Sequence, residues 1–130
     1  MNEKYQIAVI GTGSGGSEAA LLAAKKGFKV AVIESGALGG TRLHRGSFAV
    51  RALHASARLH GDFFKGKKFG VEADLFTDSL MQWMKAQRAA SIRLAHGLQK
   101  DLENLKVRVA FGRGMLVDEH RIRIEGGRLR

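Results

Sequence analysis

The chain has 130 residues, which is enough for one domain with a modest core and too short for a complete doubly wound enzyme with a second catalytic domain. It contains no cysteine, so disulfides, thiol nucleophiles and cysteine-based metal sites are excluded within these residues. Its 22 Lys and Arg residues against 12 Asp and Glu give a formal charge of +10, which can attract phosphate-rich ligands, nucleic acid or an acidic partner.

The N-terminal part of the chain predicts a strand, a glycine-rich turn, a helix and a second strand. The apolar run 7–10 leads into Gly-Thr-Gly-Ser-Gly-Gly at 11–16, and an alanine-rich helical stretch follows. Gly27 stands where a C-cap would end that helix, and the second apolar run, 30–33, is closed by Glu34. This order of features is typical of a dinucleotide-binding βαβ unit.

The glycine positions suit the binding of a pyrophosphate. Gly11 permits the tight turn out of the strand, Gly13 lets the backbone approach the phosphates, and Gly16 lets the helix pack closely on the sheet. The helix N-terminus offers unpaired N–H groups, and Glu34 can accept hydrogen bonds from a ribose diol while repelling a 2′-phosphate. The pattern predicts FAD or NAD rather than NADP. It disfavours a βαβ unit that binds no nucleotide.

The middle of the chain predicts helices joined by loops. Residues 35–41 form a loop of small residues, the second half of 42–60 has helical spacing, and 61–70 predicts an exposed turn. Asp78 is the predicted N-cap of a long helix that runs to about Asn104.

Apolar spacing along this long helix predicts burial. One face carries leucines, and the start of the helix carries a tryptophan between two methionines, for which core packing is favoured. These residues are Leu94, Leu98, Leu102 and Leu105, and Met81, Trp83 and Met84.

The C-terminal part predicts a small antiparallel β-meander from the runs 107–111, 115–117 and 121–124. Gly-Gly at 126–127 predicts a hairpin turn. Only three residues remain for a returning strand, so we expect the chain to be the front part of something longer, or a truncated relic of it. The predicted fold class is α/β, incomplete at the C-terminus.

The segment 39–53 carries a resemblance to a known family. It reads Gly-Gly-Thr-Arg-Leu-His-Arg-Gly-Ser-Phe-Ala-Val-Arg-Ala-Leu and, together with the glycine motif and Glu34, resembles the redox-active segment of the class I pyridine nucleotide-disulfide oxidoreductases. These flavoproteins include dihydrolipoamide dehydrogenase, mercuric reductase, glutathione reductase and the soluble transhydrogenase. The resemblance implies that residues 1–130 are the N-terminal portion of an FAD-binding domain with a Rossmann-like unit, and that the NAD(P)H and dimerisation domains are absent.

The sequence departs from the pattern of this family at its reactive positions. The family has Gly-Gly-Thr-Cys, four residues, Cys, and then Ile-Pro-Ser-Lys. Here Arg42 and Ser47 stand at the two cysteines, Ala49 at the proline and Arg51 at the lysine beside the flavin ring. Without thiolates there is no charge transfer to the flavin and no disulfide exchange. The resemblance therefore implies the FAD-binding part of an NAD(P)H-dependent oxidoreductase acting, if at all, on a non-disulfide acceptor.

The resemblance also assigns site residues. The glycine motif would hold the FAD pyrophosphate, Glu34 the adenosine ribose, and the later residues the flavin side of the cofactor. The predicted cofactor-binding residues are Gly11, Gly13, Ser14, Gly15, Gly16, Glu34, Gly40, Thr41, Gly46 and Arg51.

No residue is assigned outright as catalytic, although His44 and Arg51 are candidates beside the flavin. With Arg42 and Arg45 they would cluster near the isoalloxazine, where arginine stabilises an anionic reduced flavin and an imidazole can donate a proton. The alternative for these four residues is a solvated basic patch.

A second interpretation is a non-catalytic module or truncated relic. Segment 42–68 holds seven basic residues and one acidic residue, and it could bind nucleic acid or an acidic partner. Few aromatic residues interleave with these charges, namely Phe48, Phe63 and Phe64, so a small-molecule cofactor is favoured over nucleic acid. The 130-residue chain alone is not expected to be active, and NAD(P)H is expected only if a further domain exists.

Other features bear on metal, membrane and location. The histidines lack metal-ligand spacing, so no metal is assigned. No stretch approaches the ~20 uncharged apolar residues of a membrane span, and no signal-peptide pattern is present. We therefore expect a cytoplasmic protein. The family resemblance implies a homodimer for a full-length form.

Overall fold

Strand β2 (Val30–Glu34) is the centre of the fold and is buried along its whole length. The computed structural model describes residues 3–71 and 79–129. In it, β2 pairs in parallel with β1 (Ile7–Ile10) on one side and with β3 (Arg108–Asp118) on the other. Strand β4 (Arg121–Leu129) pairs antiparallel with β3, so the described strands form one sheet in the order β1-β2-β3-β4. A continuous apolar run such as β2 suits a strand whose two faces are both covered.

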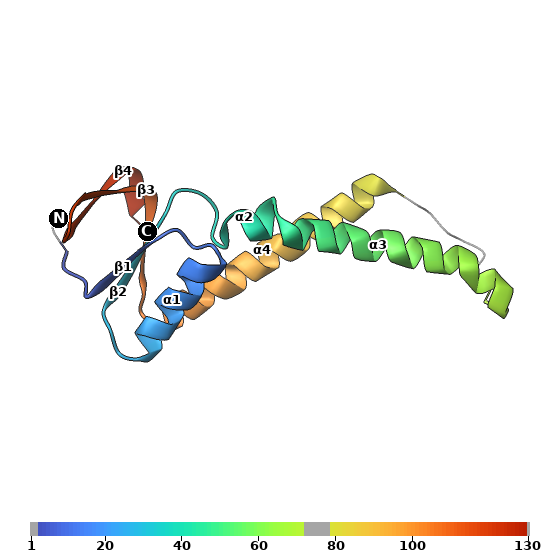
Figure 1. The fold of residues 1–130 in the computed structure, drawn as a ribbon, viewed down its shortest axis with the longest axis horizontal. Coiled ribbons are helices and arrows are strands. Elements are labelled where there is room, and N and C mark those ends of the chain that lie inside the picture. Colours follow the sequence, from blue (N-terminus) through green and yellow to red (C-terminus); the bar gives the residue numbers. More distant parts are fainter. Residues whose placement is uncertain (1–2, 72–78, 130) are drawn as a thin grey trace.

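Two helices cover one face of this sheet. Helix α1 (Ser14–Lys25) connects β1 to β2, and the last turns of α4 (Leu80–Asn104) lie beside it, as Figure 1 shows. The core between these helices and the sheet is made of small and branched apolar residues, which allow close packing. Its buried members are Ala20, Val30, Val32, Leu38, Leu102 and Val107.

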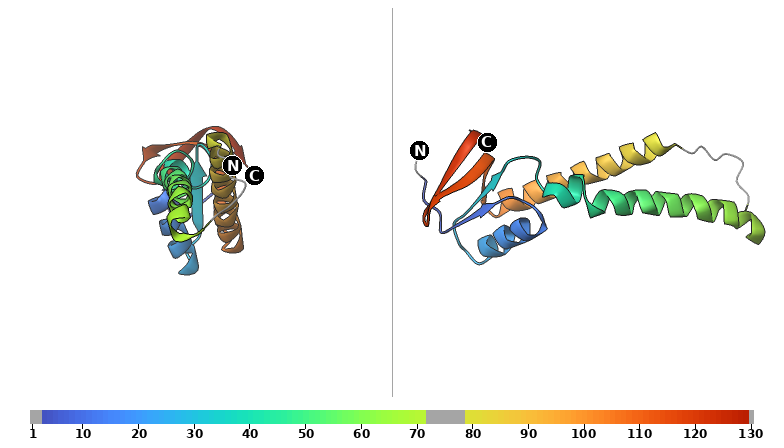
Figure 2. Two further views of the ribbon diagram at one scale, coloured as in Figure 1. Left: turned by 90° about the vertical axis from the view of Figure 1, so that its right-hand side faces the viewer. Right: turned by 45° about the horizontal axis from the view of Figure 1, so that its top comes forward.

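The other face of the sheet is covered by the hairpin of β3 and β4, which curls over it (Figure 2). A Cβ atom at Gly114 of β3 would lie 3.1 Å from Ile33 and 3.4 Å from Ile10. Glycine at this position therefore lets the hairpin approach the two strands, and Ile33 is left only 4% exposed.

The remaining helices form an arm that extends away from the sheet (Figures 1 and 2). It consists of α3 (Ser47–Gly66), a short 3-10 helix η1 (Lys67–Phe69) and the first half of α4, and α2 (Gly40–His44) joins it to the sheet end. The rings of His60 and Trp83, with centroids 5.9 Å apart, connect α3 to α4. Within the described part of the chain, no helix combines the length and apolar character needed to cross a bilayer.

The structure confirms the predicted α/β class, the strand-helix-strand order of the N-terminal unit and the end of the long helix at Asn104. Gly27 follows the C-cap of α1 with a φ of 88°, in the left-handed region expected there. The predicted N-cap, Asp78, lies outside the described residues. Helix α4 is capped instead by Ser79, whose hydroxyl accepts a hydrogen bond from the N–H of Gln82 at 3.4 Å.

The predicted exposed turn at 61–70 is wrong for its first half, because α3 continues through Gly61 to Gly66. One glycine in a helix costs about 1 kcal/mol relative to alanine, which does not end a helix with a strong amphipathic pattern. Residues 61–66 are therefore the last turns of α3 in the arm and not an exposed turn.

The end of the sheet also differs in detail from the prediction. Residues 108–111 of the first run and the run 115–117 are parts of the single strand β3, and the hairpin turn falls at 119–120. Gly126, with a φ of 68°, lies inside β4 where the pairing register with β3 shifts by one residue. The two glycines therefore form a β-bulge, which uses the same left-handed conformation as a tight turn.

Core packing at the start of α4 is wrong for the two methionines. Met81 is 79% exposed and Met84 is 54% exposed, while Trp83 is half-buried beside the ring of His60. Further along, Leu94 is also exposed, whereas Leu98, Leu102 and Leu105 pack against the core. The spacing identified one helical face correctly, but only the end of that face meets the sheet.

Candidate functional site

The glycine-rich loop after β1 is held tightly between the first two strands. Gly11 has a φ of 92°, and its N–H donates a hydrogen bond to the carbonyl of Ile33 at 2.7 Å. A Cβ atom at Gly16 would lie 2.1 Å from the carbonyl oxygen of Gly11. Only glycine permits this approach, so the first turn of α1 is fixed directly over the loop.

The N-terminus of α1 is open. Its N-cap, Gly13, has φ −61° and ψ 178°, supplies no capping side chain, and is followed by a first turn without acidic residues. Nothing in the described part of the chain comes within 4 Å of a Cβ atom built on Gly13 or Gly15. Ser14 and Gly15 are exposed, so an anion can approach the first turn of the helix, where the free N–H groups and the helix dipole favour it.

The carboxylate of Glu34 is buried next to this loop and is held by several donors. Only 6% of Glu34 is exposed. Its Oε2 accepts from the N–H of Thr12 at 2.8 Å and from the Thr12 hydroxyl, and its Oε1 accepts from the N–H of Gly36 at 2.9 Å. Burial by itself raises the pKa of Glu34, but the hydrogen bonds from Thr12, Gly36 and Ser35 outweigh it and hold the pKa below its usual range.

Sequence reasoning missed Thr12. This residue is fully buried, and its hydroxyl also accepts a hydrogen bond from the N–H of Gly39 at 3.1 Å. One side chain thus connects Glu34 at the end of β2 to the loop that precedes α2. The sequence does contain a feature that could have identified Thr12. It is a hydroxyl residue between the first two glycines of the motif, and the next strand ends in an acidic residue that can accept its hydrogen bond.

The start of α2 packs directly on the glycine loop. Gly40 has a φ of 63°, and a Cβ atom there would lie 2.9 Å from the Cα of Gly13. The structure therefore brings the predicted residues of the glycine motif, Glu34, Gly40 and Thr41 into one region. Gly46 lies at the junction of α2 and α3 against the backbone of Arg42, and Arg51 is exposed on α3.

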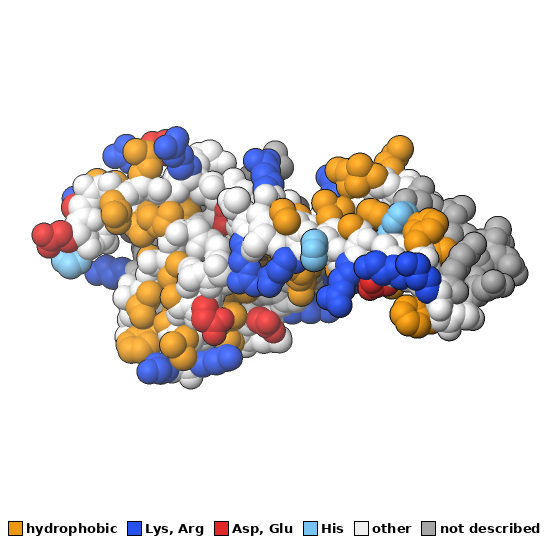
Figure 3. Space-filling model, turned by 45° about the vertical axis from the view of Figure 1, so that its right-hand side comes forward, with side chains coloured by type: hydrophobic (Ala, Val, Ile, Leu, Met, Phe, Trp, Pro, Cys, Tyr) orange, Lys and Arg blue, Asp and Glu red, His pale blue; other side chains and the backbone are white. Residues whose placement is uncertain are grey.

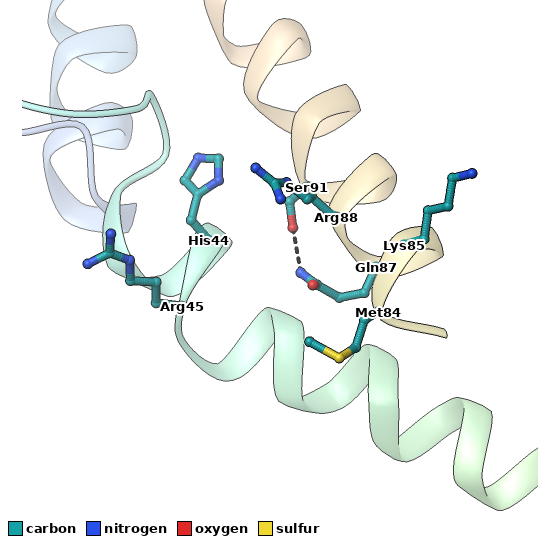
Figure 4. A pocket seen from close by; sticks show the side chains of 7 residues that line it. All are labelled: His44, Arg45, Met84, Lys85, Gln87, Arg88 and Ser91. Carbon is teal, nitrogen blue, oxygen red and sulfur yellow. Dashed lines mark hydrogen bonds between the residues drawn. The ribbon is translucent and has the colours of Figure 1, made fainter. Parts of the chain in front are cut away.

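The four basic residues predicted to cluster near a flavin do not all line one cavity. His44 Nε2 lies 2.8 Å from the carbonyl of Leu38, and His44 and Arg45 line a cavity of about 500 Å³ with α4. Arg42 and Arg51 are exposed and are not part of that lining. The complete lining, drawn in Figure 4, is His44, Arg45, Met84, Lys85, Gln87, Arg88 and Ser91.

Among residues 3–71 and 79–129, no three histidine, aspartate or glutamate side chains gather closely enough to hold a metal ion.

Comparison with known proteins connects this geometry to one family. The family model described as pyridine nucleotide-disulphide oxidoreductase matches residues 5–128. Dihydrolipoyl dehydrogenase from Chlorobaculum parvum is 33% identical over 121 residues, which are 93% of this chain and 26% of that protein. Dihydrolipoyl dehydrogenase from Chlamydia muridarum is 33% identical over 126 residues, which are 97% of this chain and 27% of that protein. The chain thus spans about a quarter of the length of these curated relatives.

Solved structures show the same fold. The Cu(II) complex of the HOCl-induced flavoprotein disulfide reductase RclA from Escherichia coli matches with a TM-score of 0.77 and 24% sequence identity. The match covers 98% of this chain and 26% of that structure. Members of the matched family are FAD-dependent flavoproteins.

Proposed function

Because the chain belongs to the pyridine nucleotide-disulphide oxidoreductase family, we propose that it binds FAD and is the FAD-binding part of an NAD(P)H-dependent flavoprotein oxidoreductase. One observation carries the proposal. The open N-terminus of α1 is fixed over the glycine loop by Gly16, directly beside the buried carboxylate of Glu34. This arrangement supplies a pyrophosphate site and an acid that disfavours a 2′-phosphate.

The residues of the chain fit the cofactor in distinct ways. The N–H groups at the start of α1 would hold the pyrophosphate, with no side chain at Gly13 or Gly15 to keep it away. Glu34 would meet the adenosine ribose. Thr12 and Gly36 already donate hydrogen bonds to its carboxylate. A ribose hydroxyl would therefore donate to the same carboxylate oxygen beside one of these groups, or would take its place.

The chemistry follows from what the chain supplies beside the cofactor. When bound, FAD supplies hydride and electron transfer. Arg42 and Ser47 stand where the family pattern has cysteines, so no thiolate is available and the acceptor we propose is not a disulfide. The charges of Arg42 and Arg51 would stabilise an anionic reduced flavin. Arg51 therefore remains one of the proposed cofactor-binding residues.

The wider context is proposed on the same basis. We propose that residues 1–130 are the N-terminal portion of an FAD-binding domain, and that Gly46 and Thr41 lie on its flavin side. NAD(P)H as reductant and a homodimer for a full-length form follow from the resemblance, whereas a cytoplasmic location was expected from the sequence pattern. All three stay predictions.

FAD binding tests the proposal directly. The protein is refolded with excess FAD, and bound flavin is measured by absorbance and by quenching of flavin fluorescence. Gly13→Ala should weaken FAD binding by about tenfold, because a methyl group would stand where the pyrophosphate approaches the backbone. Its folding should be unchanged, since nothing described lies within 4 Å of the added Cβ.

Gly97→Ala is the matched control. Gly97 lies in the exposed middle of α4, and its Cβ position is also open. This variant should bind FAD as the unmodified chain does. A refolded protein without bound flavin, or equal FAD affinity in the two variants, contradicts the proposal.

A second candidate function is binding of an acidic partner through segment 42–68. Figure 3 shows Lys and Arg side chains gathered over the middle of the molecule and along the arm. Arg42, Arg45 and Arg51 are all exposed, whereas Arg58 and Lys65 pair with Asp62. Retention on heparin should fall with salt and largely vanish in the Arg42→Ala, Arg45→Ala, Arg51→Ala triple variant if this function holds.

A further inference from the structure

The cavity between α2 and α4, here called the α2–α4 cavity, has an unbalanced charge. Its lining includes the cationic residues Arg45, Lys85 and Arg88 and no acidic residue. None of the three forms an ion pair with another described residue. The two stretches that supply the lining, 35–61 and 79–100, contain no aspartate or glutamate at all. Positive charge on facing walls without a counter-charge favours entry of an anion.

The walls of the cavity are held in place by side-chain hydrogen bonds. The Ser91 hydroxyl donates to the carbonyl of Leu43 at 3.0 Å, and Gln87 Nε2 donates to Ser91 Oγ at 2.8 Å. Ser91 is 2% exposed, so this contact between α4 and α2 is shielded from water. The two helices that face the cavity are therefore fixed relative to each other before any ligand arrives.

Figure 4 shows which side chains of the lining point into the cavity and which point away from it. The guanidinium of Arg88 on α4 points toward the side of the cavity that carries His44 on α2, whereas Arg45 and Lys85 lie at the margins and point outward. Because His44 Nε2 pairs with a carbonyl oxygen, that nitrogen carries the proton and Nδ1 is left for a ligand. Met84 adds an apolar surface, 54% exposed, on the wall next to α3.

We propose that the α2–α4 cavity binds a small phosphate monoester whose organic part is apolar. Arg88 would hold the phosphate, because a planar guanidinium pairs with two oxygens of a phosphate at once. Nδ1 of His44 would accept a hydrogen bond from a phosphate oxygen that carries a proton, and Met84 would contact the organic part. A phosphate is favoured over a single carboxylate because it offers more oxygens to Arg88, while Arg45 and Lys85 add positive charge at the margins. No residue of the glycine loop lines the cavity, so this site differs from the proposed pyrophosphate site.

Titration with phenyl phosphate, followed by amide and arginine side-chain NMR signals, tests the site. The proposal expects shifts at Ser91, Gln87 and the Arg88 side chain. Arg88→Gln should weaken binding by about tenfold, as loss of a charge-assisted hydrogen bond requires. Inorganic phosphate should bind more weakly than phenyl phosphate because it cannot contact Met84.

Arg93→Gln is the matched control, because it removes the same charge from the same helix at a residue outside the cavity lining. It should change the affinity by less than about twofold. Equal weakening in the two variants would show general attraction to a basic chain and overturn the proposal. Shifts confined to Gly13 and Gly15 would place the phosphate at α1 instead. The absence of any shift up to about 10 mM ligand would also reject the site.

Discussion

The sheet end and the α3–α4 arm distribute apolar side chains in opposite ways. At the sheet end, Val32 and Leu102 are fully buried, and the polar Thr12 is buried with them. In the arm, α3 has no buried residue, and Leu59 and Phe69 are 72% and 83% exposed. Apolar spacing of the same kind thus produces a packed core in one region and an exposed surface in the other.

This difference in burial gives the sheet end and the arm different roles. Close packing at the sheet end fixes the backbone N–H groups of the glycine loop, so a ligand can be recognised there by backbone geometry. The arm presents charged side chains with few buried contacts behind them, and segments with few such contacts open locally at low free energy. Comparable substitutions in the two regions should therefore have unequal effects.

The largest expected contrast is between two leucines. Leu102→Ala removes a fully buried side chain from the core and should lower the free energy of unfolding by about 2–5 kcal/mol. Leu59→Ala in the arm should change it by less than about 0.5 kcal/mol. Urea unfolding followed by circular dichroism measures both. A destabilisation by Leu59→Ala as large as that by Leu102→Ala would show that the arm has a packed core of its own.

Two neighbouring glycines of α1 sharpen the comparison within the sheet end. Gly16→Ala places a Cβ 2.1 Å from the Gly11 carbonyl oxygen, and the resulting shift of α1 should destabilise the fold by about 3 kcal/mol. Gly15→Ala meets nothing within 4 Å and should stabilise the helix by up to about 1 kcal/mol. Thermal unfolding of the pair checks the opposite signs. Equal midpoints for the two variants would refute the close approach of α1 to the loop.

A smaller effect is expected at Thr12. Thr12→Val keeps the shape but removes the hydroxyl, so the Glu34 carboxylate loses a donor and the N–H of Gly39 loses its acceptor. The expected loss is about 1–2 kcal/mol, measured by urea unfolding. Thr12→Ser retains the hydroxyl and should recover most of the loss. If serine is no better than valine, the hydroxyl does not carry the link between Glu34 and the loop before α2.

Much of the sheet end could be predicted from the sequence because each signal there is local. The glycine motif, the apolar strand before it and Glu34 at the end of the second strand each follow from backbone requirements of a single βαβ unit. Thr12 was missed because its role depends on two partners, Glu34 and Gly39, that only the folded chain brings together.

The arm and the C-terminal hairpin were harder to predict for a different reason. Helical spacing at Met81 and Met84 correctly indicated a helix, but burial depends on whether another element faces it. The same holds for Gly126, since a left-handed glycine serves a turn or a bulge equally well and only the pairing of β3 with β4 decides.

Acid stability provides the finest test, because it concerns one carboxylate. The pKa of Glu34 in the folded chain lies below the ordinary value of 4.5, since hydrogen bonds from Thr12, Gly36 and Ser35 outweigh the opposing effect of burial. Its contribution to stability is therefore complete above the ordinary pKa and is lost as the pH falls through the lower folded value. Urea unfolding between pH 7 and about pH 3 should show a decline that is shallower in Glu34→Gln, which has no carboxylate to titrate. Identical slopes in the two proteins would mean that the pKa of Glu34 is the same in the folded and unfolded states. Its hydrogen bonds would then be weaker than their geometry indicates.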